Sequence, residues 1–133
     1  MSLTRVSSNL SEELESLIRR TIGCCLTVHR ALGPGMSEGV YSRACRMELE
    51  ACRMSCEAEK TVPIRYRGSL ICTQRIDLLV EGQLIVEVKS VERMHPVHVA
   101  QAVSYLRAAG LRAALIVNFN VAILKQGIRR VVL

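Results

Sequence analysis

Aromatic residues are scarce in this sequence: among 133 residues there are three tyrosines, one phenylalanine and no tryptophan. The core must therefore be aliphatic, and a platform that stacks nucleic-acid bases on aromatic rings is not expected. Long hydrophobic runs are also missing, because none approaches the roughly 20 apolar residues that span a bilayer. Residues 1–17 contain no apolar signal core. We therefore expect a soluble, cytoplasmic protein with no membrane segment.

Zinc-ligand spacing is absent, although the chain has six cysteines. None of them forms a C-x-x-C pair, and no histidine lies at zinc spacing from them. Four fall in predicted helices, on or near apolar faces. We expect reduced thiols that are buried and pack as small hydrophobic side chains, as is usual in a reducing compartment.

The composition is that of one globular domain. Half of the residues are hydrophobic and 23% are charged, which excludes a disordered chain, collagen and a coiled-coil rod. We expect residues 1–10 to form a flexible N-terminal tail and residues 11–133 to form a single domain. The net charge is +6 and comes mostly from arginine. Arginine suits bidentate phosphate binding, but a solvated basic surface explains the charge equally well.

Hydrophobic periodicity predicts three helices and five strands. The helix patterns cover residues 11–32, 37–54 and 96–109, and the strand patterns cover 61–66, 70–80, 84–91, 113–117 and, more weakly, 128–132. This order predicts a three-layer α/β fold with a mixed sheet flanked by helices. In the second helix, an apolar row is formed by Val40, Ala44, Met47 and Ala51, with Tyr41 beside it.

Three charges interrupt the aliphatic hairpin predicted over residues 70–91, namely Asp77, Glu87 and Lys89. Alternation places Ile76, Leu78 and Val80 on one face and the charged residues on the other. To keep these faces separate, the connection must be of odd length or contain a bulge. We expect a three-residue loop, Val80-Glu81-Gly82, which pairs Asp77 with Ile85 and Arg75 with Glu87. Asp77 and Glu87 then become diagonal neighbours.

Two carboxylates beside a lysine predict a site for a hard cation, because oxygen ligands suit Mg²⁺ or Mn²⁺. A buried ion pair between the acids and Lys89 explains the same spacing and stays open as an alternative. A polar stripe on the third predicted helix supports the site: His98, Gln101 and Tyr105 share one face, with Val99, Val103 and Leu106 on an apolar side. Exposure of this stripe to solvent is the competing interpretation.

Asp77 followed by Glu87-Val88-Lys89 resembles the D…(D/E)-x-K signature of the PD-(D/E)XK nuclease superfamily. The segment from Gly35 through Glu38 to Tyr41 is similar to that of a small bacterial family, the GxxExxY (or GxxExxR) proteins. The resemblance extends from about residue 22 to residue 133 and includes the stretches Val28-His29-Arg30-Ala31-Leu32-Gly33-Pro34-Gly35, Ile76-Asp77-Leu78-Leu79-Val80-Glu81-Gly82, Pro96-Val97-His98, Ala100-Gln101, Tyr105-Leu106 and Asn118-Phe119-Asn120. One departure is Ile76, where the name-giving motif of the superfamily has proline.

The resemblance implies a restriction-endonuclease-like fold with an αβββαβ core and a site of defined roles. Asp77 and Glu87 would be metal ligands, and Glu38 would be a further metal-binding or catalytic acid. Lys89 would be the catalytic lysine, and Gln101 would orient the lysine or the substrate. Candidate substrate contacts are Tyr105, His98 and Arg75. The cofactor would be Mg²⁺ or Mn²⁺.

The function expected from this resemblance is a divalent-metal-dependent nuclease, with DNA more favoured than RNA as substrate. A catalytically idle module on the same fold, binding nucleic acid or a protein, is the alternative. Hydrolysis of a nucleotide or another small phosphoester is a third possibility. A homodimer would place two sites on the two strands of a duplex.

Overall fold

A five-stranded mixed sheet forms the middle layer of the computed structural model, which describes residues 9–133. The strands lie in the order β1-β2-β3-β4-β5, with β3 and β4 parallel and all other neighbours antiparallel. Their bounds are β1 Cys56–Tyr66, β2 Ser69–Val80, β3 Leu84–Lys89, β4 Ala113–Asn118 and β5 Ile128–Val132. The predicted tail, residues 1–10, lies outside the described residues except for its last two positions.

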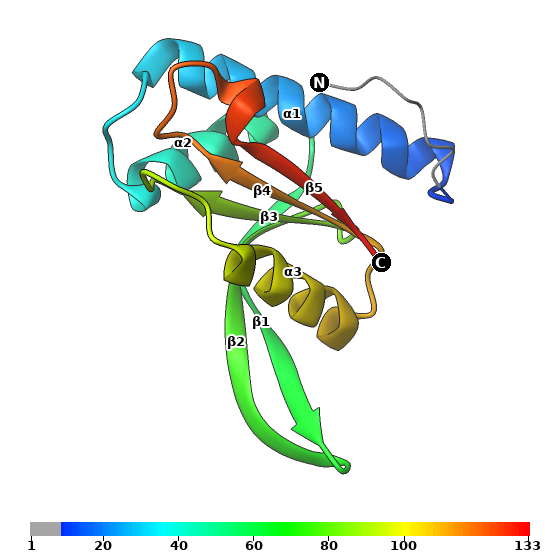
Figure 1. Ribbon diagram of the computed structural model, residues 1–133. Coiled ribbons are helices and arrows are strands. Elements are labelled where there is room, and N and C mark those ends of the chain that lie inside the picture. The colour runs from blue at the N-terminus through cyan, green and yellow to red at the C-terminus, as the bar shows by residue number, and fades with distance from the viewer. Residues whose placement is uncertain (1–8) are drawn as a thin grey trace.

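Helices cover both faces of the sheet (Figure 1). Helices α1 (Glu12–Leu32) and α2 (Glu38–Ala51) pack on one face, α3 (Pro96–Ala109) packs on the other, and a short 3₁₀ helix, η1 (Leu124–Gly127), precedes β5. These layers confirm the predicted three-layer α/β fold with a restriction-endonuclease-like element order. Within residues 9–133, no helix combines the length and the apolar character needed to cross a membrane.

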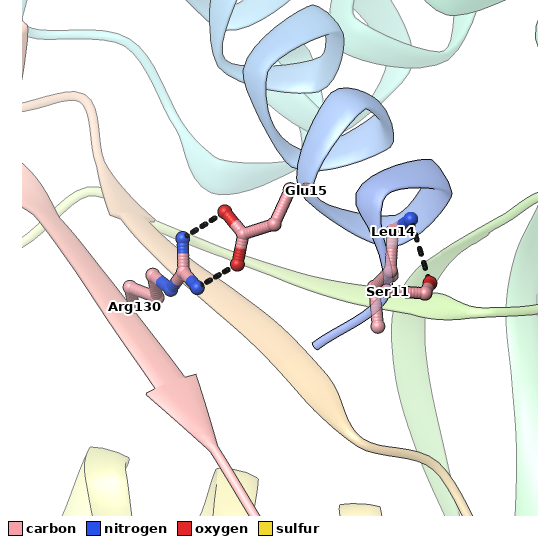
Figure 2. A network of polar contacts seen from close by, with 4 residues as sticks. All are labelled: Ser11, Leu14, Glu15 and Arg130. Carbon is pink, nitrogen blue, oxygen red and sulfur yellow. Dashed lines mark hydrogen bonds and ion pairs between the residues drawn. The ribbon is translucent and has the colours of Figure 1, made fainter. Parts of the chain in front are cut away.

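Helix α1 begins and ends as its sequence predicts. Ser11 caps it, because the Leu14 backbone N–H donates to Ser11 Oγ at 3.1 Å. The helix ends at Gly33, which has a φ of +67°. Glu15 on α1 forms a bidentate ion pair with Arg130 on β5, so the helix is tied to the last strand (Figure 2). Arg130, at the basic C-terminal edge, is therefore engaged within the fold.

Helix α2 is shorter than predicted and buries a different face. It ends at Ala51, and its buried residues are Tyr41, Cys45 and Leu49. The apolar row noted in the sequence is not the buried one, since Val40 is 43% exposed and Met47 is 63% exposed. The buried row is held instead by the Tyr41 ring, which stacks on Phe119 with ring centroids 4.5 Å apart.

The cysteines follow the expectation only in part. All six are free thiols, and Cys24, Cys25 and Cys45 are buried. Cys52 and Cys72 are exposed, so they do not act as core residues. Cys52 is the residue that directly follows α2, which ends at Ala51.

The turn between β2 and β3 confirms the predicted parity but not the predicted register. The observed pairs are Leu79 with Ile85 and Val80 with Leu84, so the three-residue loop is residues 81–83 rather than 80–82. Glu81 explains the shift. Its backbone N–H donates to the Ser55 carbonyl oxygen at 2.9 Å, and its carboxylate accepts the Ser55 N–H at 2.9 Å.

Tyr41→Phe tests how firmly the loop before α2 is held. The buried Tyr41 hydroxyl donates to the Gly33 carbonyl oxygen and accepts the Met36 backbone N–H at 3.1 Å. Removing it leaves both backbone groups without this partner, and we expect a loss of about 1–3 kcal/mol in the free energy of unfolding. Chemical denaturation measures the change. Tyr66→Phe is the matched control, because Tyr66 is 67% exposed; equal stabilities of the two variants would contradict the account.

Candidate active site

The candidate site lies where β1 and β2 both depart from regular strand geometry. Glu59 of β1 has a φ of +55° in the middle of the strand. In β2, Ile76 and Leu79 pack under α3, whereas Leu78 packs under α1 and α2. Since Ile76 and Leu79 are three positions apart and share a face, strict alternation is broken between them, at Asp77. The predicted face is therefore confirmed for Leu78 and Val80 and wrong for Ile76.

Asp77 and Glu87 are brought directly together across β2 and β3. The observed register, extended by one residue, sets Asp77 opposite Glu87 rather than diagonal to it. The Val88 backbone N–H donates to Asp77 Oδ2 at 2.7 Å, and the Asp77 N–H donates to Glu87 Oε1 at 3.3 Å. Each carboxylate thus accepts a backbone N–H of the opposite strand where a regular ladder would use a carbonyl oxygen.

Glu87 has the most perturbed carboxylate of the site. Its residue is 6% exposed. Burial and, next, the negative charge of Asp77 raise its pKa to about 8, although the backbone N–H of Asp77 and the charge of Lys89 act to lower it. Two adjacent carboxylates in a poorly solvated position therefore favour a bound proton or a bound cation.

Lys89 is the last residue of β3 and lies within electrostatic range of Glu87. Its backbone is fixed by the parallel partner strand, because the Phe119 N–H donates to the Lys89 carbonyl oxygen at 3.0 Å. The structure thus brings together the three charged residues that the sequence singles out, with the two acids in contact and the lysine beside Glu87.

Glu38 enters the site from α2. As the first residue of that helix, it lines a pocket of about 130 Å³ together with Asp77 and Glu59. The loop that presents it is held by Tyr41 and by Ser90, whose hydroxyl donates to the Met36 carbonyl oxygen at 2.6 Å. The two loops after α1 and after β3 are thereby joined beside the pocket.

Helix α3 faces the charged residues with two members of its predicted polar stripe. Burial raises the pKa of Tyr105, and the charges of Glu87 and Asp77 raise it further, which places the phenol near both acids. The pKa of His98 is lowered by partial burial first and then by the positive charges of Lys89 and His95, whereas the negative charge of Glu38 acts to raise it. Gln101, between them on the helix, is exposed.

The apolar side predicted for α3 is only partly correct. Leu106 is buried and Val103 is half-buried, but Val99 is 37% exposed. The buried residues of the helix are Ala102, Tyr105 and Leu106. Tyr105 is buried because its ring packs in the core cluster between α3 and the sheet, so it belongs to both the apolar and the polar side of this helix.

Arg75 does not contact Glu87 as predicted. It pairs with Thr61 across the β1–β2 ladder, and its guanidinium lies 3.7 Å from Glu59 Oε2. Both side chains of this ion pair are largely exposed. The observed register differs from the predicted one by two residues along β3, so Asp77 rather than Arg75 lies opposite Glu87.

Two residues near the site were given no role by the sequence reasoning. Glu59 lies in the pocket with Glu38 and Asp77 and has a positive φ. A positive φ is uncommon for glutamate, so its residue type gave no reason to predict this conformation. Asn118, 2% exposed, accepts the Val91 N–H at 3.1 Å and donates to the Val91 carbonyl oxygen at 2.9 Å. It anchors the connection from β3 to α3. A polar residue at the end of an otherwise aliphatic strand is the sequence signal that could have indicated a role for Asn118.

The donors present fit a hard divalent cation. Mg²⁺ commonly binds to one or two protein carboxylates and keeps several waters, and Asp77 and Glu87 supply two that are in contact. The like-charge contribution that raises the pKa of Glu87 is one that a bound cation would remove. In the described residues, no group of three or more His, Cys, Asp or Glu side chains is arranged to hold a metal ion. Any cation here would rely on water for most of its ligands.

Comparison with known proteins gives one match. A family model described as the PD-(D/E)XK nuclease superfamily matches residues 15–131, a range that includes every candidate site residue. No curated protein and no solved structure matches the chain significantly.

Proposed function

Because the chain belongs to the PD-(D/E)XK nuclease superfamily, we propose that it is a divalent-metal-dependent phosphodiester hydrolase that acts on nucleic acid, DNA in preference to RNA. Nucleases of this superfamily generally use divalent metals. The observation that supports the proposal most strongly is the direct contact of Asp77 with Glu87 beside Lys89. A buried pair of carboxylates is costly unless a cation or a proton offsets it.

In this proposal, Asp77 and Glu87 bind Mg²⁺ or Mn²⁺, and Glu38 contributes directly or through water. A divalent ion bound there would polarise a phosphoryl oxygen and lower the pKa of a bound water. Lys89 stabilises the negative charge that develops on the phosphate during in-line attack. Gln101 orients the lysine or the substrate.

Substrate contacts are proposed for Tyr105, His98 and Arg75. The first two are supported by their positions on α3, with Tyr105 near Asp77 and Glu87 and His98 near Lys89. Arg75 is exposed beside Glu59 and can reach phosphate only by releasing that weak ion pair.

We also assign the chain to the GxxExxY group and residues 11–133 to one catalytic domain. The segment from Gly35 to Tyr41 supports the assignment, because Tyr41 is buried under Phe119 and Glu38 lies in the pocket with Asp77. For cleavage of both strands of a duplex, a homodimer would supply the second site.

A module that binds nucleic acid or a protein without cutting is the second candidate. It is favoured by the small number of ligands, since the described residues contain no cluster of three metal-ligating side chains. The two candidates differ in catalysis and not in fold.

The test is a substrate panel with purified wild-type protein: supercoiled plasmid, linear duplex, single-stranded DNA and RNA, each with Mg²⁺, Mn²⁺ or EDTA. We expect cleavage of at least one substrate in metal and none in EDTA. Lys89→Met, purified in parallel, controls for contaminating nucleases and should be at least about 100-fold slower. Binding without cleavage would support the second candidate, and neither binding nor cleavage would contradict both nucleic-acid functions.

A further inference from the structure

Residues 60–76 form a two-stranded extension that we call the hairpin arm. The β1–β2 hairpin continues beyond the rest of the sheet and past α3 (Figure 1). Within the arm only Val62 and Ile76 are buried and Ile64 is half-buried, and every other residue is exposed. The tip turns at Arg67 and Gly68, which have φ values of +52° and +80°. This extension adds little to the core, so its sequence is free to serve another purpose.

The arm is purely basic. It contains Lys60, Arg65, Arg67 and Arg75 and no aspartate or glutamate. The chain from residue 93 to its end, which includes α3, also has no acidic residue. Two surfaces that are both free of carboxylates therefore flank the space between the arm and α3.

A groove of about 480 Å³ occupies this space. Its walls are Pro63, Ile64 and Arg65 from the arm and Ser104, Arg107 and Ala108 from α3. Lys60 and Arg75, at the base of the arm, form ion pairs with Glu57 and Glu59. In the described part of the chain, no ion pair is formed by Arg65 or Arg107, so both guanidinium groups keep their donors available for an anion.

The groove is on the same face of the sheet as the candidate site. Arg107 is two residues after Tyr105 on α3, and the phenol of Tyr105 lies close enough to Glu87 and Asp77 for their charges to raise its pKa. His98, near Lys89, is nine residues before Arg107, or about 14 Å along the helix. A strand leaving the candidate site along α3 would reach the groove within a few nucleotides.

We propose that this groove binds the sugar–phosphate backbone of the nucleic-acid substrate, with Arg65 and Arg107 on phosphates and Arg67 extending the contact at the arm's tip. The inference rests on the proposed function and assigns the substrate path that leads to its site. Arginine presents paired donors that match phosphate oxygens. A two-stranded β-ribbon also has the width that the major groove of a duplex admits.

The test is binding of a labelled 20-base-pair duplex in EDTA, so that no cleavage occurs. The doubly substituted variant Arg65→Gln/Arg107→Gln should bind at least tenfold more weakly than wild type. The slope of log K against log salt should fall by about 1.8, because each phosphate contact contributes about 0.9. Arg19→Gln/Arg30→Gln removes the same charge from exposed positions of α1, on the opposite face of the sheet, and should stay within twofold of wild type. Equal losses in the two double variants would overturn the groove.

Further measurements separate this proposal from others. Arg65 and Arg107 are exposed, so thermal midpoints should match wild type; Arg67→Gln, at the tip, repeats the binding test independently. Hydrolysis of bis(p-nitrophenyl) phosphate by wild type in Mn²⁺ reports on the candidate site without needing the groove. If wild type hydrolyses no substrate but Arg65→Gln/Arg107→Gln binds duplex more weakly, the proposed function is wrong and the groove proposal is supported. Hydrolysis together with unchanged binding would defeat the groove alone.

The exposed apolar residues near the tip, Tyr66, Leu70 and Ile71, raise the possibility of a second copy as the occupant. Sedimentation of Leu70→Ser/Ile71→Ser decides this. If wild type is a dimer that these substitutions dissociate, and Arg65→Gln/Arg107→Gln leaves duplex binding unchanged, the arm is a dimer contact, and the nucleic-acid groove is overturned. If the sedimentation of the variant matches wild type, the arm is free for nucleic acid, as proposed.

Discussion

Asp77→Asn is expected to lower metal-dependent cleavage by at least about 10³-fold and to abolish measurable Mn²⁺ binding. Asparagine has nearly the same size, and its side-chain oxygen can still accept the Val88 N–H that Asp77 Oδ2 accepts at 2.7 Å. The strand geometry should therefore survive while one of two negative ligands is lost. Cleavage rates and isothermal titration with Mn²⁺ measure the two effects.

The matched control is Glu50→Gln, which removes one negative charge from an exposed ion pair with Arg46 on α2. Its cleavage rate and Mn²⁺ affinity should equal those of wild type. Retention of more than about a tenth of the activity in Asp77→Asn would contradict the assignment of Asp77 as a metal ligand, whatever the substrate.

Glu87→Gln is expected to change the pH dependence of stability in metal-free protein. The folded-state pKa of Glu87 is raised to about 8 by burial and by Asp77, from an ordinary value of 4.5. Between these values the folded protein binds more protons than the unfolded chain, so wild-type stability falls as pH rises. The full shift corresponds to an upper bound of roughly 5 kcal/mol. Chemical denaturation in EDTA from pH 4 to pH 9 measures it.

Glutamine does not titrate, so Glu87→Gln should lack this decline and be more stable than wild type at pH 9. Mn²⁺ at pH 8 should stabilise wild type and not the variant, because an ion that binds only the folded state raises its stability. If the free energies of unfolding of the two proteins change in parallel across this pH range, the pKa of Glu87 is not raised in the folded state and this account is contradicted.

Elements with local signals were predictable from the sequence. Helix α3 runs from Pro96 to Ala109 as predicted, since proline at the first helical position and Gly110, with a φ of +70°, define both ends locally. The odd length of the β2–β3 loop followed from the need to keep aliphatic faces together. Its register did not, because Ser55, far away in sequence, holds Glu81.

Edge positions carried too little hydrophobic signal to be predicted. β1 begins at Cys56, whereas the sequence pattern predicted a start at residue 61. The pattern missed the first five residues because most of them are polar and several are exposed at the sheet edge. In α2, choosing the more hydrophobic letters selected Met47, whereas the fold buries Tyr41 beneath Phe119. Both errors come from tertiary partners that a single sequence window does not contain.

The charged residues of the candidate site were predictable from the sequence, because burying a charge in a strand costs free energy unless the charge is paired or bound to a metal. Asp77, Glu87 and Lys89 stood out for that reason, and the structure brings them together. The break in alternation at Asp77 and the positive φ of Glu59 were not predictable, because they depend on two strands bending at the same level.

The most direct measurement is an anomalous difference map from crystals of the wild-type protein grown with Mn²⁺. A peak bonded to carboxylate oxygens of both Asp77 and Glu87, with Lys89 near it, is the predicted result. Full Mn²⁺ occupancy elsewhere in the molecule, with these two side chains still bonded only to backbone N–H groups, would contradict it.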